Sequence, residues 1–260
     1  MDSTVLLAIP FGIVIGLVVG TVGGGGAILA LPVLVYVLGE GVGPASTASL
    51  IVVAIAAGVG GGALAWRGHV CWRLALTFSL PAAIGSLLGT VANGAVSGKV
   101  LILAFVPVMA IAAGATWQRA GSSRDEGMGE CPPLQVGRIV AFGTVVGVMT
   151  GFFGVGGGFL IVPALTLGLG VNFRRAVATS LVIITVTGVV ALASHLAADA
   201  HLAVAVTASL AASTAAGALI GTNIGQRMPQ AALGKAFAAV VALLAVFLLA
   251  DTLLFNGPPQ

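Results

Sequence analysis

The chain has 260 residues, of which 59% are hydrophobic and only 7% are charged. A soluble domain carries about 25% charged residues, so this chain has too few polar side chains to cover a water-facing surface. The composition predicts an all-α polytopic membrane protein with the lipid bilayer as its solvent. The net charge of +3 comes from scattered residues that form no basic patch, and we expect no nucleic-acid partner.

Ten apolar segments follow one another along the chain. The first begins without a positively charged region or a cleavage site, so we expect it to be retained and not removed as a signal peptide. The predicted segments are 4–20, 27–38, 45–66, 74–92, 100–118, 138–153, 157–170, 176–197, 202–222 and 234–255. The polar stretch "QRAGSSRDEGMGECPPLQVGR" separates the fifth from the sixth. We therefore predict a first membrane repeat at 1–118, a polar linker at 119–137 and a second membrane repeat at 138–260.

The two halves resemble each other in sequence. "GIVIGLVVGTVGGGGAILALP" begins at Gly12 and "GTVVGVMTGFFGVGGGFLIVP" begins at Gly143, a shift of 131 residues. The same shift places Pro32 on Pro163 and aligns one serine in each half. Low complexity can produce matching glycines, but it does not easily produce a fixed register that includes the proline and the serine. The sequence therefore predicts an internal duplication.

The distribution of lysine and arginine favours an inverted arrangement of the halves. If the first two segments of each half form one span, the ten basic residues divide five against five. If they form a hairpin that returns to its own side, nine lie on one side and only Lys99 on the other, as the positive-inside rule favours. We therefore predict two inverted-topology repeats, each a glycine-broken helical hairpin plus three spanning helices. Both termini are then outside and the linker is cytoplasmic.

The glycine-rich break in each hairpin predicts an anion-binding site. Segment 27–38 is only about 18 Å long as a helix, against a hydrocarbon core of ~30 Å, which places the break at membrane depth. Non-helical backbone there is tolerated where it lines a cavity or is buried in protein. Its N–H groups lie at the positive end of a helix dipole, and glycine lets a ligand approach them. The predicted substrate-binding residues are Gly23, Gly24, Gly25, Gly26, Ala27, Ser49, Gly154, Val155, Gly156, Gly157, Gly158 and Ser180.

These residues also have plainer interpretations. Glycines spaced by four, such as Gly12, Gly16 and Gly20, form packing faces, although packing explains consecutive glycines less well. Most hydroxyl groups in the segments are expected to close helix–helix contacts, although Ser49 and Ser180 match across the repeat. A nucleotide-binding loop is disfavoured, because "GVGGGF" lacks the flanking strand, the lysine and the acidic residue.

No group of side chains indicates a metal, a cofactor or an enzyme. Cys71 and Cys131 lack metal-site spacing, and their default interpretation is two free thiols in loops; a disulfide is an alternative that the sequence does not favour. His195, Asp199 and His201 have a spacing compatible with a proton relay or a weak metal site, but an ordinary loop is the simpler explanation. We find no Ser-His-Asp or Cys-His arrangement with supporting context, and we expect no catalysis.

The motif "GxxxGxxxGxxGxGGGxxxxP", duplicated around a short polar linker, resembles the sulfite exporter TauE/SafE family, also called the toluenesulfonate uptake permease family. The resemblance covers 10–118 and 138–254. It implies a bacterial inner-membrane transporter of sulfur-containing anions such as sulfite, sulfonates or related organosulfur acids. Family members are commonly described with seven or eight spans, which differs from the hairpin count. The two copies also differ from each other, with Gly24 and Ala27 aligned to Val155 and Gly158.

We therefore expect a secondary transporter that exports a small sulfur-containing anion by alternating access. A negative-inside potential favours anion export by about 2.3 kcal/mol per charge per 100 mV, and no acidic residue lies in a segment core to carry a proton. The alternatives are a passive anion channel, an uptake permease coupled to protons, and a non-transporting sulfur-handling protein that uses Cys71 or Cys131. The expected partners are the anion and the bilayer, with the oligomeric state left open.

Overall fold

The computed structural model describes residues 3–93, 98–122, 129–153, 158–196 and 204–254. Within these ranges the chain is helical and contains no β-strand, which confirms the all-α prediction. Every predicted apolar segment coincides with one helix or with two short helical pieces. The α-helices are α1 (Ser3–Val22), α2 (Ala27–Pro32), α3 (Val42–Trp66), α4 (Trp72–Asn93), α5 (Gly98–Ser122), α6 (Val136–Phe153), α7 (Gly158–Pro163), α8 (Phe173–Leu196), α9 (Val204–Arg227) and α10 (Gln230–Leu254).

Two predicted segments, 27–38 and 157–170, each form a short α-helix followed by a π-helical turn. In the first, α2 is followed by a π-helical turn at Val33–Val37, and in the second, α7 is followed by one at Ala164–Gly168. A proline ends each short α-helix, and because proline has no N–H to continue the regular bonding, a wider turn follows. A 3₁₀ turn at Gly24–Gly26 joins α1 to α2.

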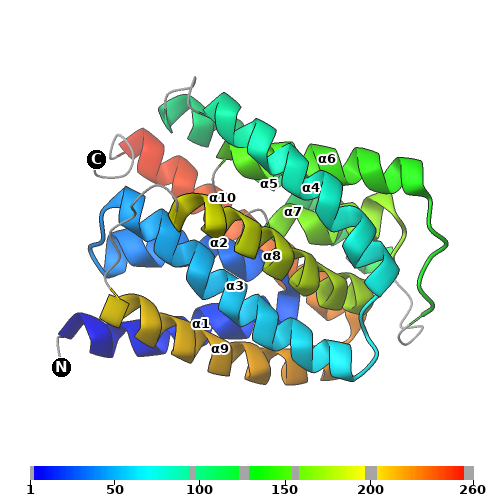
Figure 1. Ribbon diagram of the computed structural model, residues 1–260, viewed down its shortest axis with the longest axis horizontal. Helices are drawn as coiled ribbons and strands as arrows, with labels where there is room; N and C mark the ends of the chain where they lie inside the picture. Colours follow the sequence, from blue (N-terminus) through cyan, green and yellow to red (C-terminus); the bar gives the residue numbers. More distant parts are fainter. Residues whose placement is uncertain (1–2, 94–97, 123–128, 154–157, 197–203, 255–260) are drawn as a thin grey trace.

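The first hairpin returns to the end of the bundle from which it starts. On α1, Gly12 faces Ser213 and Gly20 faces Thr222, so α1 runs parallel to α9. Figure 1 shows α1 and α3 both running from left to right. The segment between two helices of the same direction must run backwards, so α2 and its π-turn form the returning leg.

The second hairpin behaves in the same way from the opposite end. Gly143 faces Pro81 and Gly151 faces Ser86, so α6 runs parallel to α4. In Figure 1, α6 and α8 both run from right to left, opposite to α1 and α3. The two hairpins therefore enter the bundle from opposite ends, which is the geometry that an inverted repeat requires.

Glycines hold these parallel pairs together. We call the contact of Gly12, Gly16 and Gly20 with α9 the first seam, and that of Gly143, Gly147 and Gly151 with α4 the second seam. A Cβ added at Gly16 would overlap the carbonyl oxygen of Thr214, and one at Gly147 would overlap that of Ala82. Only glycine allows the two backbones to come this close, so the predicted packing role of the spaced glycines is confirmed.

Six described helices are long and apolar enough to cross a membrane. They cover Pro44–Trp66, Trp72–Thr90, Val136–Phe153, Phe173–Val190, Ala205–Arg227 and Gln230–Ala250. Large apolar side chains such as Leu76, Leu80 and Leu88 are exposed, as expected of a surface that faces lipid. The chain is therefore a polytopic membrane protein.

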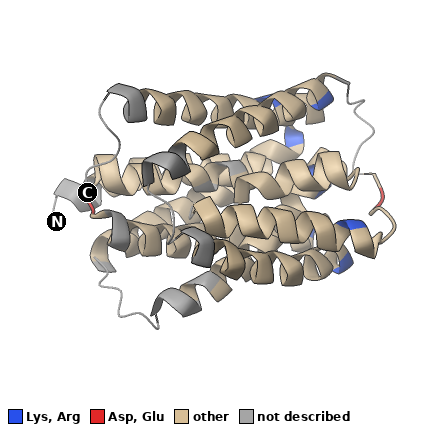
Figure 2. Ribbon diagram, turned by 90° about the horizontal axis from the view of Figure 1, so that it is seen from above, with Lys and Arg blue, Asp and Glu red and all other residues tan. Residues whose placement is uncertain are grey.

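Apart from Lys99 at the start of α5, the lysine and arginine residues of the described ranges gather at one end of the bundle, as Figure 2 shows. They belong to the end of α3, α5 and α9, to the start of α8 and α10, and to positions near the start of α4 and α6. Trp66, Trp72 and Trp117 lie at the same end and are 96%, 53% and 51% exposed. Tryptophan favours the membrane–water interface, so this basic end lies at one surface of the bilayer.

Candidate functional site

The two glycine breaks contact each other inside the bundle. Gly24 of the first break and Gly158 at the start of α7 are both buried, and their backbones touch. A Cβ added at Gly158 would lie 3.0 Å from the Cα of Gly24 and 3.1 Å from its carbonyl oxygen. A Cβ at Gly24 would overlap the carbonyl group of Gly158. Hairpins that enter from opposite ends thus meet where the first break contacts the start of α7.

The two glycines in contact are positions at which the copies differ. Gly24 aligns with Val155, and Gly158 aligns with Ala27. Because each glycine faces the backbone of the other, a valine at position 24 would overlap the Gly158 carbonyl, and an alanine at position 158 would crowd the Gly24 backbone. This contact gives a physical reason for the departure from the repeat.

Gly23 and Gly26 of the first break also have steric reasons to be glycine. Gly23 adopts φ +78°, a left-handed conformation that favours glycine, and an added Cβ would lie 2.9 Å from the hydroxyl oxygen of Ser180. A Cβ at Gly26 would lie 2.5 Å from the backbone nitrogen of Val19. Close packing therefore accounts for more of the glycine run than the sequence suggested.

Backbone donors at the first break are partly engaged. The Gly23 N–H donates to the Val19 carbonyl at 2.8 Å, and the Gly26 N–H donates to the Gly23 carbonyl at a long 3.4 Å. The expected open helix start is thus a tight 3₁₀ turn. The backbone of Gly25 and Ala27 belongs to this turn and to α2. Gly154, Val155, Gly156 and Gly157, the predicted tip of the second break, lie outside the described residues.

The matched serines occupy different surroundings. Ser180 is fully buried beside Gly23, and its hydroxyl donates to the Val177 carbonyl at 2.8 Å. Ser49 is half-buried, and its hydroxyl donates to the Ser46 carbonyl at 2.8 Å. The structure therefore brings Ser180 to the first break, while the residues at 154–157 that would test Ser49 in the same way are not described.

Most other hydroxyl candidates bond within their own helix. Thr21, Thr90, Thr150 and Thr222 each donate to a carbonyl three or four residues earlier. Such bonds use the hydroxyl proton locally, so these hydroxyl groups donate within their own helices and not across a helix–helix contact. Thr179 differs, because its Oγ1 accepts the backbone N–H of Cys71 at 3.2 Å and so ties α8 to the start of α4.

The returning legs end in a shared backbone pattern that sequence reasoning missed. The Leu38 N–H donates to Val33 at 3.0 Å, and the Leu169 N–H donates to Ala164 at 3.2 Å. Both legs then pass through a left-handed glycine, at position 39 with φ +70° and position 170 with φ +68°. The shift of 131 residues relates each of these features to its partner, and the two glycines were the available signal.

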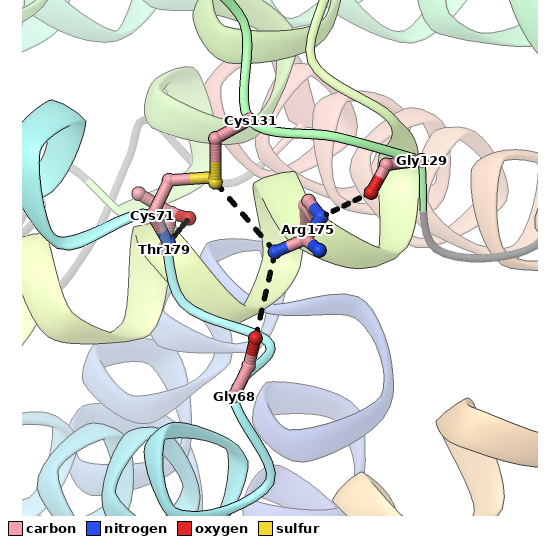
Figure 3. Close-up of a disulfide and its surroundings, with 6 residues drawn as sticks. All are labelled: Gly68, Cys71, Gly129, Cys131, Arg175 and Thr179. Carbon is pink, nitrogen blue, oxygen red and sulfur yellow. Dashed lines mark hydrogen bonds between the residues drawn. A yellow bond between two sulfur atoms is a disulfide. The ribbon is translucent and has the colours of Figure 1, made fainter.

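The two cysteines are bonded to each other, so the expectation of two free thiols is wrong. Cys71 precedes α4 and Cys131 lies in the linker, with their Cα atoms 5.8 Å apart across a disulfide. Both lie outside helices, as predicted. They meet because the turn after α3 and the linker both reach the start of α8, where Arg175 donates to the Gly129 carbonyl at 2.8 Å (Figure 3). Spacing along the chain carries no sign of this convergence.

The histidines do not form a site in the described residues. His69 lies in the turn after α3, and its pKa is lowered by burial and by the nearby charges of Arg175, Arg67 and Arg174. Asp199 and His201 lie outside the described residues, as does the side chain of His195. Among the residues that are described, no three His, Cys, Asp or Glu side chains come together as a metal site requires.

Apolar spanning helices around two broken hairpins define a polytopic membrane protein of the transporter class. The chain belongs to the sulfite exporter TauE/SafE family, whose model matches residues 8–248. It is 32% identical over 198 residues to a probable membrane transporter protein of Xylella fastidiosa strain 9a5c, covering 72% of each chain. A second Xylella fastidiosa protein of that name, from strain Temecula1, is 33% identical over 191 residues, again covering 72% of each chain.

A more distant relative covers almost the full length. A probable membrane transporter protein of Methanocaldococcus jannaschii is 23% identical over 271 residues, covering 96% of this chain and 98% of that one. No solved structure matches. The relatives support the family assignment and membrane transport.

Proposed function

We propose that this protein is a secondary transporter that exports a small sulfur-containing anion, such as sulfite or a sulfonate, across the bacterial inner membrane. The observation that carries the proposal is the contact of the two broken hairpins at Gly24 and Gly158. The family name supports a sulfur oxyanion as the substrate class. The anion is held by backbone N–H groups of the two breaks, together with Ser49 and Ser180.

Alternating access follows from the way the hairpins meet. Each hairpin is anchored at its own end of the bundle, the first by its seam with α9 and the second by its seam with α4. The contact between Gly24 and Gly158 has no room for an anion in the described state. Binding therefore requires the tips to separate, and a tip that opens toward one end exposes its N–H groups to that side only.

The membrane potential supplies the driving force in this proposal. The segment cores contain no acidic residue to carry a coupling proton. A negative-inside potential favours export of each anionic charge by about 2.3 kcal/mol per 100 mV, so export needs no coupling ion. The basic end faces the cytoplasm by the positive-inside rule, and the start of α1 and the end of α10 then face the periplasm.

Counterflow in proteoliposomes tests the proposal. Vesicles loaded with unlabelled sulfite should accumulate labelled sulfite transiently, at a rate that saturates with concentration. A passive channel would equilibrate without overshoot and would carry large unitary currents. Uptake that requires an inward proton gradient, and that stops when the gradient is collapsed, would replace the exporter by the proton-coupled permease.

A further inference from the structure

The disulfide between Cys71 and Cys131 joins the first half of the chain to the linker between the halves. Cys71 is in the turn that connects α3 to α4, and Cys131 is in the linker before α6, 60 residues further on. Figure 3 shows the bridge beside α8, with Arg175 directed toward it. The bridge therefore tethers the linker to the first half at the basic end of the bundle.

The two cysteine residues are not equally exposed. The residue Cys71 is only 3% exposed, whereas Cys131 is exposed. A cavity of about 530 Å³ opens beside the bridge and is lined by both cysteines, Trp72, Arg73 and Pro132. Of the two cysteines that line this cavity, Cys131 is the more exposed residue and is therefore the expected point of attack for a small molecule.

The surroundings of the exposed sulfur favour an anion. The Nη1 atom of Arg175 lies 3.6 Å from the Cys131 sulfur, and the Nε of the same side chain donates to the Gly129 carbonyl, which fixes the guanidinium in place. Arg73 adds a second positive charge at the cavity wall. Glu130 is the described acidic residue next to the bridge, so positive charge exceeds negative charge here.

The buried sulfur is placed to leave as a thiolate. The Ala75 N–H donates to the Cys71 carbonyl at 2.8 Å, so Cys71 lies at the N-cap of the 22-residue helix α4. The positive end of the helix dipole stabilises a thiolate at this position. A thiolate that is stabilised in this way leaves more readily in exchange at a disulfide.

We propose that this disulfide is a covalent acceptor site for sulfite, which breaks the bridge and becomes attached to Cys131. The sulfur lone pair of sulfite attacks the Cys131 sulfur and forms a new S–S bond. The electron pair of the old bond leaves on Cys71 as a thiolate, so the products are an S-sulfonate on Cys131 and a thiolate on Cys71. The Arg175 guanidinium pairs with the sulfonate oxygens.

The reaction is reversible and needs no other redox partner. When sulfite is scarce, the Cys71 thiolate attacks the Cys131 sulfur, expels sulfite and re-forms the bridge. High sulfite thus releases the linker from the α3–α4 turn, and low sulfite tethers it again. This proposal rests on the proposed function in one respect: the anion that reacts at the disulfide is the anion that the protein is proposed to transport.

Mass spectrometry of the purified, unreduced chain tests the site without measuring transport. Before treatment, the protein should contain no free thiol. After exposure to sodium sulfite, peptide mapping should find one sulfonate on Cys131, and a maleimide should label Cys71. Sodium sulfate and methanesulfonate have no lone pair on sulfur, so neither should open the bridge. Free thiols at the start, a sulfonate on Cys71, or no adduct with sulfite would each overturn the proposal.

Charge variants test the role of Arg175. We expect Arg175→Gln to slow adduct formation roughly tenfold or more, because it removes a charge-assisted contact to the oxyanion. Arg175→Lys should recover much of the rate. Arg227→Gln removes one exposed charge from the same end of the bundle and should leave the rate unchanged. Equal rates in Arg175→Gln and Arg227→Gln would show that the bridge reacts without the proposed oxyanion contact.

The outcomes separate this proposal from the proposed function. Wild-type protein that passes the counterflow assay but forms no adduct would remain a transporter without an acceptor site. Protein that forms the adduct but shows no counterflow would have the acceptor site without the proposed transport.

Discussion

Glycine brings backbones together in two regions of this molecule, the seams and the meeting point of the breaks. In the first seam, Gly12, Gly16 and Gly20 are spaced by four, the helix continues through them, and each faces α9. At the break the glycines are nearly consecutive, the helix is interrupted, and Gly24 faces Gly158 of the other hairpin.

The two regions differ in which elements they join. A seam fastens a hairpin to its supporting helix, and in the proposed mechanism that pair moves as one body. The break joins the two hairpins, which alternating access must separate. Close contact between backbones at glycine therefore has a structural role in the seams and, in the proposed mechanism, a functional role at the break. Substitutions in the seam should impair folding, and substitutions at the tip positions Gly25 and Gly156 should impair transport.

The largest expected effect is that of Gly16→Leu in the first seam. The new side chain would meet the backbone of Thr214 and Ala218, which cannot move aside as a flexible side chain can. Overpacking of this kind costs about 1–3 kcal/mol and occasionally more. We expect a loss of monodisperse protein on size-exclusion chromatography and a lower thermal midpoint.

Gly62→Leu is the matched control for this substitution. Gly62 lies within α3, and an added Cβ there meets no atom within 4 Å. The variant should express and melt like the wild type. If Gly16→Leu behaved in the same way as Gly62→Leu, the seam would not be a structural contact.

The next effect concerns the tip of the second break. Gly156→Leu should leave a folded, monodisperse protein and reduce counterflow at least about tenfold, corresponding to ~1.4 kcal/mol, because the side chain fills the space of the anion. Gly156→Asp should be at least as damaging, because its carboxylate occupies the dipole end in place of the substrate. Gly25→Leu makes the same test in the first break. Full transport by the double variant Gly25→Leu/Gly156→Leu would place the anion elsewhere.

Most of the fold could be predicted from the sequence, because membrane helices are recognised by their apolar composition. Apolar segments predicted the helices, and the count of basic residues on each side predicted the returning hairpins. The disulfide was missed, because its formation depends on a turn and a linker meeting at Arg175, and no local pattern encodes that meeting. The π-turns were also missed, although the prolines and the aligned glycines at 39 and 170 marked their ends.

The candidate site was predictable only in part. The duplication pointed to both breaks and to the paired serines, and the structure places Ser180 beside Gly23. The duplication could not show that Gly24 and Gly158 touch, because that contact joins positions that do not correspond in the repeat. Which glycines pack is decided by neighbours from the other half, and these are not visible in one half's sequence.

A smaller effect is expected for Ser180→Ala, which removes a single hydroxyl group beside the first break. If the Ser180 hydroxyl turns to the anion when the tips separate, the KM for counterflow should rise about threefold to tenfold, as expected for loss of one hydrogen bond. Ser79→Ala is the control, because Ser79 is a buried serine on α4 that also donates within its helix. Equal KM values for the two variants would assign Ser180 to packing.

The smallest expected effect is a change in the stability of the protein with pH. The glycines of the seams and the break carry no titratable group and cannot cause it. His69 does carry one, and its pKa is lowered in the folded protein by burial, by Arg175 and Arg174 on α8, and by Arg67 in its own turn. Its Nδ1 is buried without a hydrogen-bond partner. The unfolded chain therefore binds a proton more readily, and stability should fall as the pH drops below about 6.5.

The loss should level off once the pH passes below the folded pKa, because both states are then protonated. The measurement is the thermal midpoint in detergent between about pH 7.5 and about pH 5.5, the interval that spans an ordinary histidine. His69→Gln should match the wild type at the upper pH and lose less stability on acidification. An identical decline in both proteins would mean that the acid sensitivity lies elsewhere, and that the positive charge of the basic end does not act through this turn.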